Sequence, residues 1–220
     1  METDTSPGRI LLIKKPLEWT SFDVVNKLRY ILKTKKIGHA GTLDPLATGL
    51  LIICVGKMTK RIEEFMGQEK EYTGKFVLGQ TTPSYDLETA VNETKDISAV
   101  TPEAIYAAAI PFLGTISQLP PLHSAIKVGG KRAYEFARKG LEIELKPRDV
   151  EIKSFEITAI SLPEVSFRIV CSKGTYIRSI ARDFGNALQV GAHLSELCRT
   201  RIGNFTLENA LTLDQVKDEQ

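Results

Sequence analysis

Long apolar runs are missing from this sequence, and so are the residue patterns that hold most metals and disulfides. The longest apolar stretch, 50–55, is far shorter than the roughly 18 residues that a membrane-spanning helix needs. Only three cysteines and three histidines occur, without a C-x-x-C or H-x-x-x-H pair. We therefore predict no metal, no cofactor and no membrane segment, and we expect the cysteines to be small core side chains.

An excess of charge of either sign is also missing. The 29 Lys and Arg residues nearly balance the 27 Asp and Glu residues, which leaves a formal charge of +2 over 220 residues. Hydrophobic residues make up 42% and charged residues 25%, so the composition excludes a largely disordered chain. Residues 1–5 are polar and acidic, unlike a secretory signal. We expect a folded cytoplasmic protein.

Short strands and helices alternate irregularly along the chain. Helices are predicted after the capping signals Thr20-Ser21 and Thr101-Pro102, and after Gly174-Thr175, where 177–188 carries one apolar stripe. A short helix is predicted over 57–65 and a loop over 36–46. Strands are predicted over 10–14, 50–55, 71–78, 150–161 and 165–171, with strand, turn and strand over 190–205. This pattern predicts an α+β fold with a mixed, mostly antiparallel sheet flanked by helices.

Positive charge is concentrated in one stretch, 127–148, where seven cations face three glutamates, a local charge of +4. The cations are Lys127, Lys131, Arg132, Arg138, Lys139, Lys146 and Arg148. Such a stretch suits an arm that lies along a phosphate backbone. A solvated surface helix and hairpin is the alternative interpretation.

The most informative segment is the loop 38–49, G-H-A-G-T-L-D-P-L-A-T-G. It places one carboxylate, Asp44, among apolar residues just before a buried strand, and loops on a rigid scaffold commonly carry reactive groups. Its glycines permit unusual backbone geometry, and Pro45 stiffens the position after the carboxylate. An Asp-Pro pair also caps ordinary turns, so these residues alone leave a catalytic and a structural role open.

This loop and several further blocks, in order over residues 9–205, resemble the bacterial TruB family of tRNA pseudouridine synthases. The blocks are Lys15-Pro16, Trp19-Thr20-Ser21, 38–51, Lys70-Glu71-Tyr72, 118–127, 134–140, 174–179 and 193–199. The resemblance implies the pseudouridine synthase fold over 9–220, after a flexible tail at 1–8. The basic stretch then corresponds to an insertion, at about 116–148, that closes over the RNA. We expect no C-terminal PUA domain, because only 15 residues follow Phe205.

The resemblance also implies a reaction, the isomerisation of uridine 55 in the T loop of tRNA to pseudouridine. The N1–C1′ glycosidic bond breaks and a C5–C1′ bond forms. Asp44 matches the family's catalytic aspartate, Arg178 the arginine that pairs with it, and Tyr72 the tyrosine that stacks on the base and is a candidate acid/base at C5. Without the resemblance, Arg178 would be interpreted as a surface charge in the first turn of a helix, and Tyr72 as core.

Four further residues match substrate-binding positions of the family. His39 matches the histidine that occupies the space left by the flipped uridine, and Lys60 matches a lysine that contacts phosphate. Tyr176 and Leu197 match residues that wall the pocket. The segment 83–86 departs from the family's usual Thr-Asp-Thr pattern, which puts a secondary contact by Asp86 in doubt.

The partner implied is the T-arm stem-loop of tRNA, bound by a monomer, and the class implied is an isomerase of the intramolecular transferase type. The alternative is a non-catalytic tRNA-binding or folding factor of the same fold. The joint presence of Asp44, Tyr72 and Arg178 favours the enzyme. A guide-RNA-dependent relative is disfavoured, because those proteins depend on the C-terminal domain expected to be absent.

Overall fold

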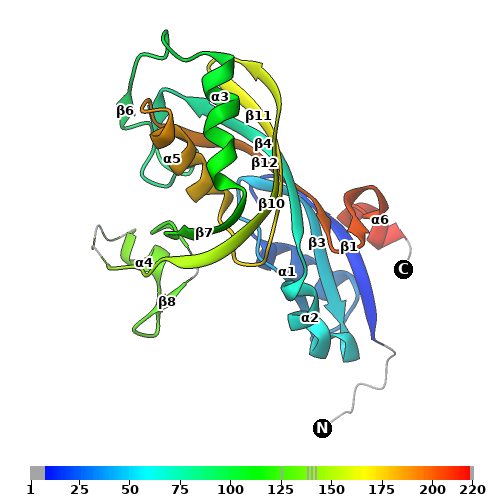
Figure 1. Ribbon diagram of the computed structural model, residues 1–220. Coiled ribbons are helices and arrows are strands. Elements are labelled where there is room, and N and C mark those ends of the chain that lie inside the picture. The colour runs from blue at the N-terminus through cyan, green and yellow to red at the C-terminus, as the bar shows by residue number, and fades with distance from the viewer. Residues whose placement is uncertain (1–7, 125, 138, 140, 142, 219–220) are drawn as a thin grey trace. The chain divides into compact units, whose positions relative to one another are not determined.

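The computed structural model describes residues 8–218 except 125, 138, 140 and 142 (Figure 1). The chain divides into two compact units, of which unit 1 comprises Met1–Thr73 and Glu196–Gln220 and unit 2 comprises Gly74–Ser195. The predicted tail at 1–8 lies outside the described residues apart from Gly8. None of the helices in the described ranges has the length and apolarity to cross a membrane.

The strands of unit 1 follow the order β1-β3-β12-β4, with β2 paired to β3 and β13 paired to β12. Their bounds are β1 (Arg9–Lys15), β2 (Ile37–Ala40), β3 (Ala47–Val55), β4 (Lys70–Leu78), β12 (Ala192–Ile202) and β13 (Phe205–Thr206). One edge of β3 pairs antiparallel with β1, from Arg9↔Val55 to Lys15↔Gly49. Its other edge pairs antiparallel with β2 at residues 52–55 and parallel with β12 at 47–49. The central strand of unit 1 therefore changes partner along its length.

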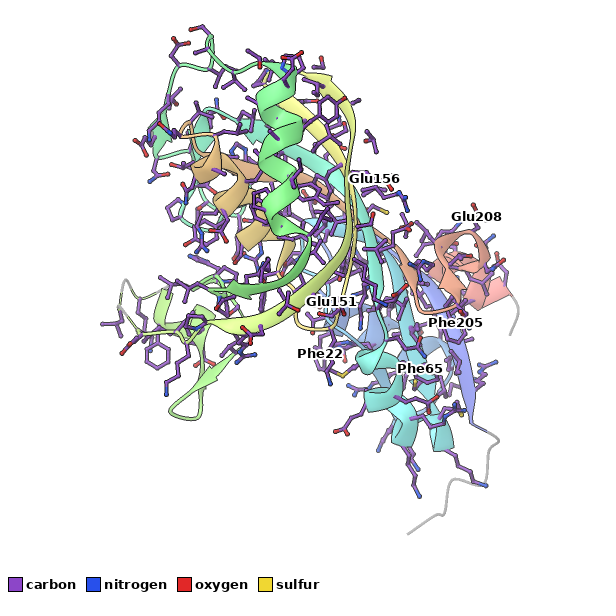
Figure 2. The ribbon with its side chains drawn as sticks, viewed as in Figure 1. Phe22, Phe65, Glu151, Glu156, Phe205 and Glu208 are labelled. Atoms are coloured by element: carbon purple, nitrogen blue, oxygen red, sulfur yellow. The ribbon has the colours of Figure 1, made fainter. Side chains whose placement is uncertain are left out.

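Strand β3 is buried on both faces, as its continuous apolar sequence predicts. Leu51 and Ile53 point into a core cluster with helix α1 (Ser21–Ile31), which begins at a Thr20–Asp23 capping box. The alternate residues Leu50, Ile52 and Cys54 point into a second cluster that contains Phe65. In that cluster Phe65 meets Phe205 edge-on at 5.8 Å (Figure 2). The remaining helices of unit 1 are η1 (Gly56–Arg61), α2 (Ile62–Gly67), η3 (Leu207–Asn209) and α6 (Leu213–Asp218).

In unit 2 the strand order is β12-β4-β11-β10-β7. The long strand β10 (Arg148–Ser161) pairs antiparallel with β11 (Glu164–Cys171) on one side and with β7 (Gly114–Gln118) on the other. The principal helices are α3 (Pro102–Ala109) and α5 (Ile177–Ala187). The small elements are β5 (Gln80–Thr81), β6 (Glu93–Thr94), η2 (Ile110–Phe112), β8 (Lys127–Val128), β9 (Lys131–Arg132) and α4 (Ala133–Ala137).

The core of unit 2 is a cluster of phenylalanine rings. Phe76 and Phe167 stack with their centroids 4.2 Å apart, and Phe184 of α5 lies 5.5 Å from Phe76. Phe155 of β10 meets Phe76 edge-on. Aromatic pairs at these separations contribute beyond the apolar area that they bury. The cluster therefore fixes α5 against the strands of its own unit.

The structure confirms the α+β class, with a mixed and mostly antiparallel sheet. The predicted helices after Thr20, Thr101 and Thr175 form, and Thr20 and Thr101 cap theirs as expected. The predicted loop 36–46 is wrong over Ile37–Ala40, which forms β2 because it pairs with the distant end of β3. Residues 57–65 begin as the 3-10 helix η1 before α2. Cys54 and Cys171 are buried as expected, and Cys198 is half-buried.

We expect Phe76→Ala to lower the free energy of unfolding by about 3–5 kcal/mol, because it leaves a cavity among the stacked rings of unit 2. The matched control is Tyr106→Ala on α3, where the ring is 53% exposed and the loss should stay near 0.5 kcal/mol. Urea denaturation followed by circular dichroism measures both. Equal losses in the two variants would contradict this account of the core.

Candidate active site

The loop that carries Asp44 joins β2 to β3, at the point where the edge of β3 passes from β2 to β12. Leu197 of β12 pairs with Ala47, which places Leu197 beside the end of the loop. The Thr48 hydroxyl donates to the Leu197 carbonyl at 3.3 Å. Asp44 itself is half-buried. The irregular segment that carries the carboxylate therefore lies where β3 changes from one strand partner to the other.

A buried arginine holds the first half of this loop. Arg199 of β12 is 1% exposed, and its Nη2 and Nη1 donate to the carbonyls of Gly41 and Thr42 at 3.1 and 3.4 Å. Its Nε donates to the carbonyl of Leu50 in β3 at 2.8 Å. Gly49 has a φ of 107°, and a Cβ there would lie 2.3 Å from the Arg199 carbonyl oxygen. Only glycine therefore permits this close approach of β3 and β12.

Two further side chains hold the backbone of the residues that flank Asp44. The Ser21 hydroxyl, at the start of α1, donates to the Leu43 carbonyl at 3.2 Å and accepts from the Leu43 amide at 2.9 Å. Lys15 of β1 is 1% exposed, and its Nζ donates to the Pro45 carbonyl at 3.2 Å. The same Nζ donates to the carbonyls of Pro16 and Trp19. The peptide groups on both sides of the carboxylate are therefore fixed.

Charge around the loop favours an ionised Asp44. Burial lowers the pKa of Lys15 from 10.5 to about 8, and the positive charge of Arg199 lowers it as well. The negative charge of Asp44 acts in the opposite direction and raises the pKa of Lys15, so the carboxylate lies within electrostatic reach of this ammonium group. A nearby opposite charge stabilises the ionised form of an acid. A carboxylate that must act as base or nucleophile needs this setting.

The other unit 1 residues singled out by the sequence occupy three elements. His39 lies in β2, where burial, and secondarily the charge of Arg199, lower the pKa of its imidazole. Its ring is therefore neutral at neutral pH. Tyr72 is half-buried on β4, the strand next to β12 in unit 1. Lys60 is exposed in η1, the turn of 3-10 helix that follows β3.

The remaining two predicted site residues, Arg178 and Tyr176, lie in unit 2. Arg178 is 3% exposed, which excludes the alternative of a surface charge. Its Nη1 forms an ion pair with Asp86 at 3.5 Å, and its Nη2 donates to the His123 carbonyl at 2.8 Å. The unusual sequence at 83–86 therefore keeps a contact from Asp86, contrary to the doubt raised above.

Tyr176 is the N-cap residue of α5, and a buried glutamine fixes its backbone. The Tyr176 amide donates to Gln118 Oε1 at 2.8 Å, and Gln118 Nε2 donates to the Tyr176 carbonyl at 3.1 Å. One turn on, the Ser179 hydroxyl donates to the Leu119 carbonyl at 2.8 Å. Segment 118–123 is thus attached to the first turn of α5. Its last residue, His123, accepts a hydrogen bond from Arg178 through its carbonyl.

Sequence reasoning gave no role to Lys15, Arg199 or Gln118. Lys15 directly follows Lys14 in β1, and β12 carries Glu196 and Arg201 beside Arg199, so the sequence gives no signal that either cation is buried. Gln118 carried no signal either, because its two bonds depend on a partner 58 residues away. Among the described residues no cluster of three or more His, Cys, Asp or Glu side chains could hold a metal ion.

We expect Lys15→Met to change the pH dependence of stability. Between about pH 8 and 10.5, Lys15 has lost its proton in the folded chain and kept it in the unfolded chain, so the free energy of unfolding rises with pH. The variant lacks this group. The free energy of unfolding of the wild type minus that of the variant should therefore increase across this window.

Urea denaturation at both ends of the window measures this difference. The matched control is Lys14→Met, one residue earlier on β1, where the side chain is exposed. That variant should show a constant difference from the wild type. A constant difference for Lys15→Met would contradict a charged, buried Lys15 below pH 8.

Two family models cover most of the chain. Residues 29–177 match the N-terminal domain of the TruB family pseudouridylate synthases, and residues 178–220 match the tRNA pseudouridylate synthase B C-terminal domain. The chain is 55% identical over 213 residues to tRNA pseudouridine synthase B of Flavobacterium johnsoniae, covering 94% of this chain and 93% of that protein. It is 52% identical over 221 residues to the protein of the same name from Parabacteroides distasonis, covering 98% and 94%.

Solved structures agree. A chain in the crystal structure of a Cbf5-Nop10-Gar1 complex superposes with a TM-score of 0.75 at 33% identity, over 95% of this chain. A chain in an H/ACA RNP bound to a substrate RNA containing 2′-deoxyuridine superposes with a TM-score of 0.71 at 30% identity. This chain spans about half of their length, 53% and 52%. With both family models matched and the Flavobacterium relative aligned over more than nine-tenths of both chains, the chain belongs to the TruB family of pseudouridylate synthases.

Proposed function

We propose that this protein is a tRNA pseudouridine synthase, an isomerase that converts uridine 55 of the T loop to pseudouridine. The names of its relatives support the tRNA substrate and the reaction class. The observation that carries the proposal is the fixed loop, in which Ser21 and Lys15 hold the residues on both sides of Asp44. We expect the protein to act as a monomer in the cytoplasm.

Asp44 is the catalytic carboxylate of this proposal. It either attacks C1′, with the resulting ester bond breaking when C5 attacks, or removes the C2′ proton in a glycal route and later returns it, and both roles require the ionised form that Lys15 favours. Glycoside hydrolases use two carboxylates, because one protonates the leaving group and the other activates water or attacks. Here the leaving uracil remains bound and returns, so one carboxylate is enough.

The reaction balances within the nucleotide. The electron pair of the N1–C1′ bond leaves with the uracil ring, the ring turns, and C5 supplies the pair that forms the C5–C1′ bond. The C5 proton is then removed and N1 takes up a proton, so no oxidant or reductant is needed. Tyr72 is the candidate group for the C5 proton and stacks on the base.

The target base must leave its stack in the folded arm, which costs a few kcal/mol. His39, neutral because of its burial, suits the vacated space in the loop, since RNA readers stack aromatic rings on or between bases. Leu197 and Tyr176 wall the pocket, and Lys60 contacts phosphate. The basic insertion at about 116–148 closes over the arm.

We further propose that Arg178 pairs with Asp44. A guanidinium group has five N–H donors. Arg178 therefore keeps its bonds to Asp86 and the His123 carbonyl and still meets a second carboxylate.

Asp44→Asn keeps the shape of the side chain and removes its charge. We expect the release of tritium from C5-labelled tRNA to fall by at least about 10³-fold, since single catalytic groups have effects of this size or larger. The dissociation constant for tRNA should stay within a factor of about three, because the substitution neither adds bulk nor removes a cation. The matched control, Asp214→Asn on α6, is exposed and should turn over like the wild type. Retained turnover in Asp44→Asn would favour the alternative of a non-catalytic tRNA-folding factor.

A double variant separates the two roles of Arg178. Arg178→Met alone should lower the free energy of unfolding by about 3–5 kcal/mol, because it leaves the buried carboxylate of Asp86 without its cation. Arg178→Met with Asp86→Asn should recover most of that stability. Tritium release should stay at least about 100-fold below the wild type in both, since neither variant supplies a cation for Asp44. If the double variant regained turnover together with stability, the proposed pairing with Asp44 would be wrong.

A further inference from the structure

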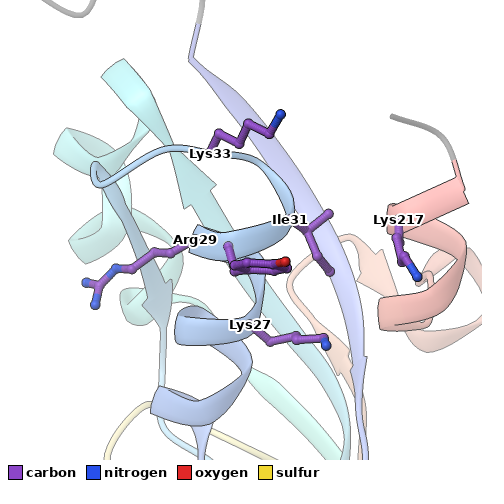
Figure 3. A pocket seen from close by; sticks show the side chains of 6 residues that line it. Lys27, Arg29, Ile31, Lys33 and Lys217 are labelled. Atoms are coloured by element: carbon purple, nitrogen blue, oxygen red, sulfur yellow. The ribbon is translucent and has the colours of Figure 1, made fainter.

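A basic hollow lies on unit 1 between the end of α1 and α6. Its volume is about 590 Å³, and its lining residues are Lys27, Arg29, Tyr30, Ile31, Lys33 and Lys217. Figure 3 shows Lys27 and Ile31 on the side of α1 that faces α6, which carries Lys217. Four of the six lining side chains are cationic and none is acidic. The described residues that line this hollow thus present positive charge alone.

The protein itself does not neutralise these four cations. Within the described ranges, none of them forms an ion pair, and Arg29 makes one side-chain hydrogen bond, to Asn26 Oδ1 at 3.0 Å. The sequence from 22 to 36 holds five cations and one acid, a local charge of +4. The acids of α6, Asp214 and Asp218, are exposed and lie outside the lining.

Helix electrostatics account for part of this charge only. Arg29 lies in the last turn of α1 and Lys33 just beyond it, where cations stabilise the helix dipole. Lys27 lies a turn earlier, and Lys217 belongs to another helix. Figure 3 shows the Arg29 guanidinium on the side of α1 away from α6, where it contacts Asn26 and the Phe22 ring. The gathering of the three lysines around one hollow therefore needs a further reason, and an anion bound there supplies it.

Exposed aromatic rings accompany the cations. Tyr30 is 81% exposed, and Phe22, which lies 57% exposed on α1, has the Arg29 guanidinium 5.5 Å from its ring centroid. Cationic grooves with exposed aromatic rings are typical of proteins that bind nucleic acid strands, since the rings stack on unpaired bases. A lipid surface would instead be met by a continuous apolar face, and Ile31 is the one aliphatic residue of the lining.

We propose that this hollow binds the phosphate backbone of the substrate RNA, as a second contact apart from the Asp44 loop. The inference rests on the proposed function, which makes RNA the substrate. Ser21, at the start of α1, contacts the loop, and Ile31 ends the same helix, so the rise of the helix separates the two places by roughly 15 Å. A stretch of backbone several nucleotides from the reacting uridine occupies the hollow, where Tyr30 stacks on a base.

The test compares two triple variants of equal charge change. The first is Lys27→Gln/Lys33→Gln/Lys217→Gln. The control is Lys14→Gln/Lys95→Gln/Lys153→Gln, which alters exposed lysines elsewhere. Fluorescence anisotropy measures the dissociation constant for full-length tRNA over a range of salt concentrations.

We expect the first variant to bind about tenfold more weakly at 0.1 M salt, and its slope of log affinity against log salt to be smaller by about 2 to 3, because three phosphate contacts are lost. Tyr30→Ser should weaken binding several-fold, and Tyr30→Phe, which keeps the ring, should not. Thermal unfolding of each variant checks its fold, and a destabilised Tyr30→Ser leaves the comparison of the two triple variants to decide.

An unchanged affinity and slope in the first variant would overturn the inference, and so would an equal loss in the control triple.

Vesicles of phosphatidylcholine with a quarter of phosphatidylglycerol test the lipid alternative. Binding to them that the first variant loses, with its tRNA affinity intact, would assign the hollow to a membrane instead. Wild-type tritium release is measured in parallel. Absent turnover contradicts the proposed function, whereas turnover with unchanged binding by the variant contradicts this inference alone.

Discussion

Two buried cations and one irregular loop stabilise each other in unit 1. Lys15 and Arg199 are each 1% exposed, and a buried charge is costly unless hydrogen bonds replace its water. The carbonyls of the loop between β2 and β3 supply several of these bonds, and those of Pro16, Trp19 and Leu50 supply the others. Buried carbonyls in an irregular segment themselves need donors, because no strand partner provides them. The loop that carries Asp44 is therefore held by a network in which the buried cations donate to its carbonyls and its carbonyls replace the water of the cations.

The same kind of interaction recurs in unit 2. Arg178 is buried at the start of α5 and donates to the backbone of two segments, at Ser84 and His123. Gln118 adds a two-bond bridge to Tyr176. In both units, long polar side chains hold loop backbone in place of regular secondary structure. Loops fixed in this way can present reactive groups with little freedom, and preorganised groups are what catalysis of a bond exchange requires.

Local signals predicted the helices of this fold well. Thr20 and Thr101 cap α1 and α3, and a cap is a contact among residues three apart in the chain. Strand β2 was missed because its four residues form a strand only through Val55 and its neighbours in β3. The Asp44 loop was found, yet Arg199, which holds it, lies 157 residues from Thr42. The resemblance singled out Arg178 as a proposed site residue, and its burial and its ion pair with Asp86 emerged from the structure.

Residue order alone was enough for the fold class and the family, and it singled out Asp44 as the proposed catalytic carboxylate, since these inferences follow from nearby residues and from short motifs. Folding decided which charges are buried, which carbonyls they meet, and where unpaired cations gather. Lys27 and Lys217 are 190 positions apart along the chain and yet line one hollow. Which distant residues lie side by side depends on strand register and helix packing. Register and packing arise from the whole set of long-range contacts at once.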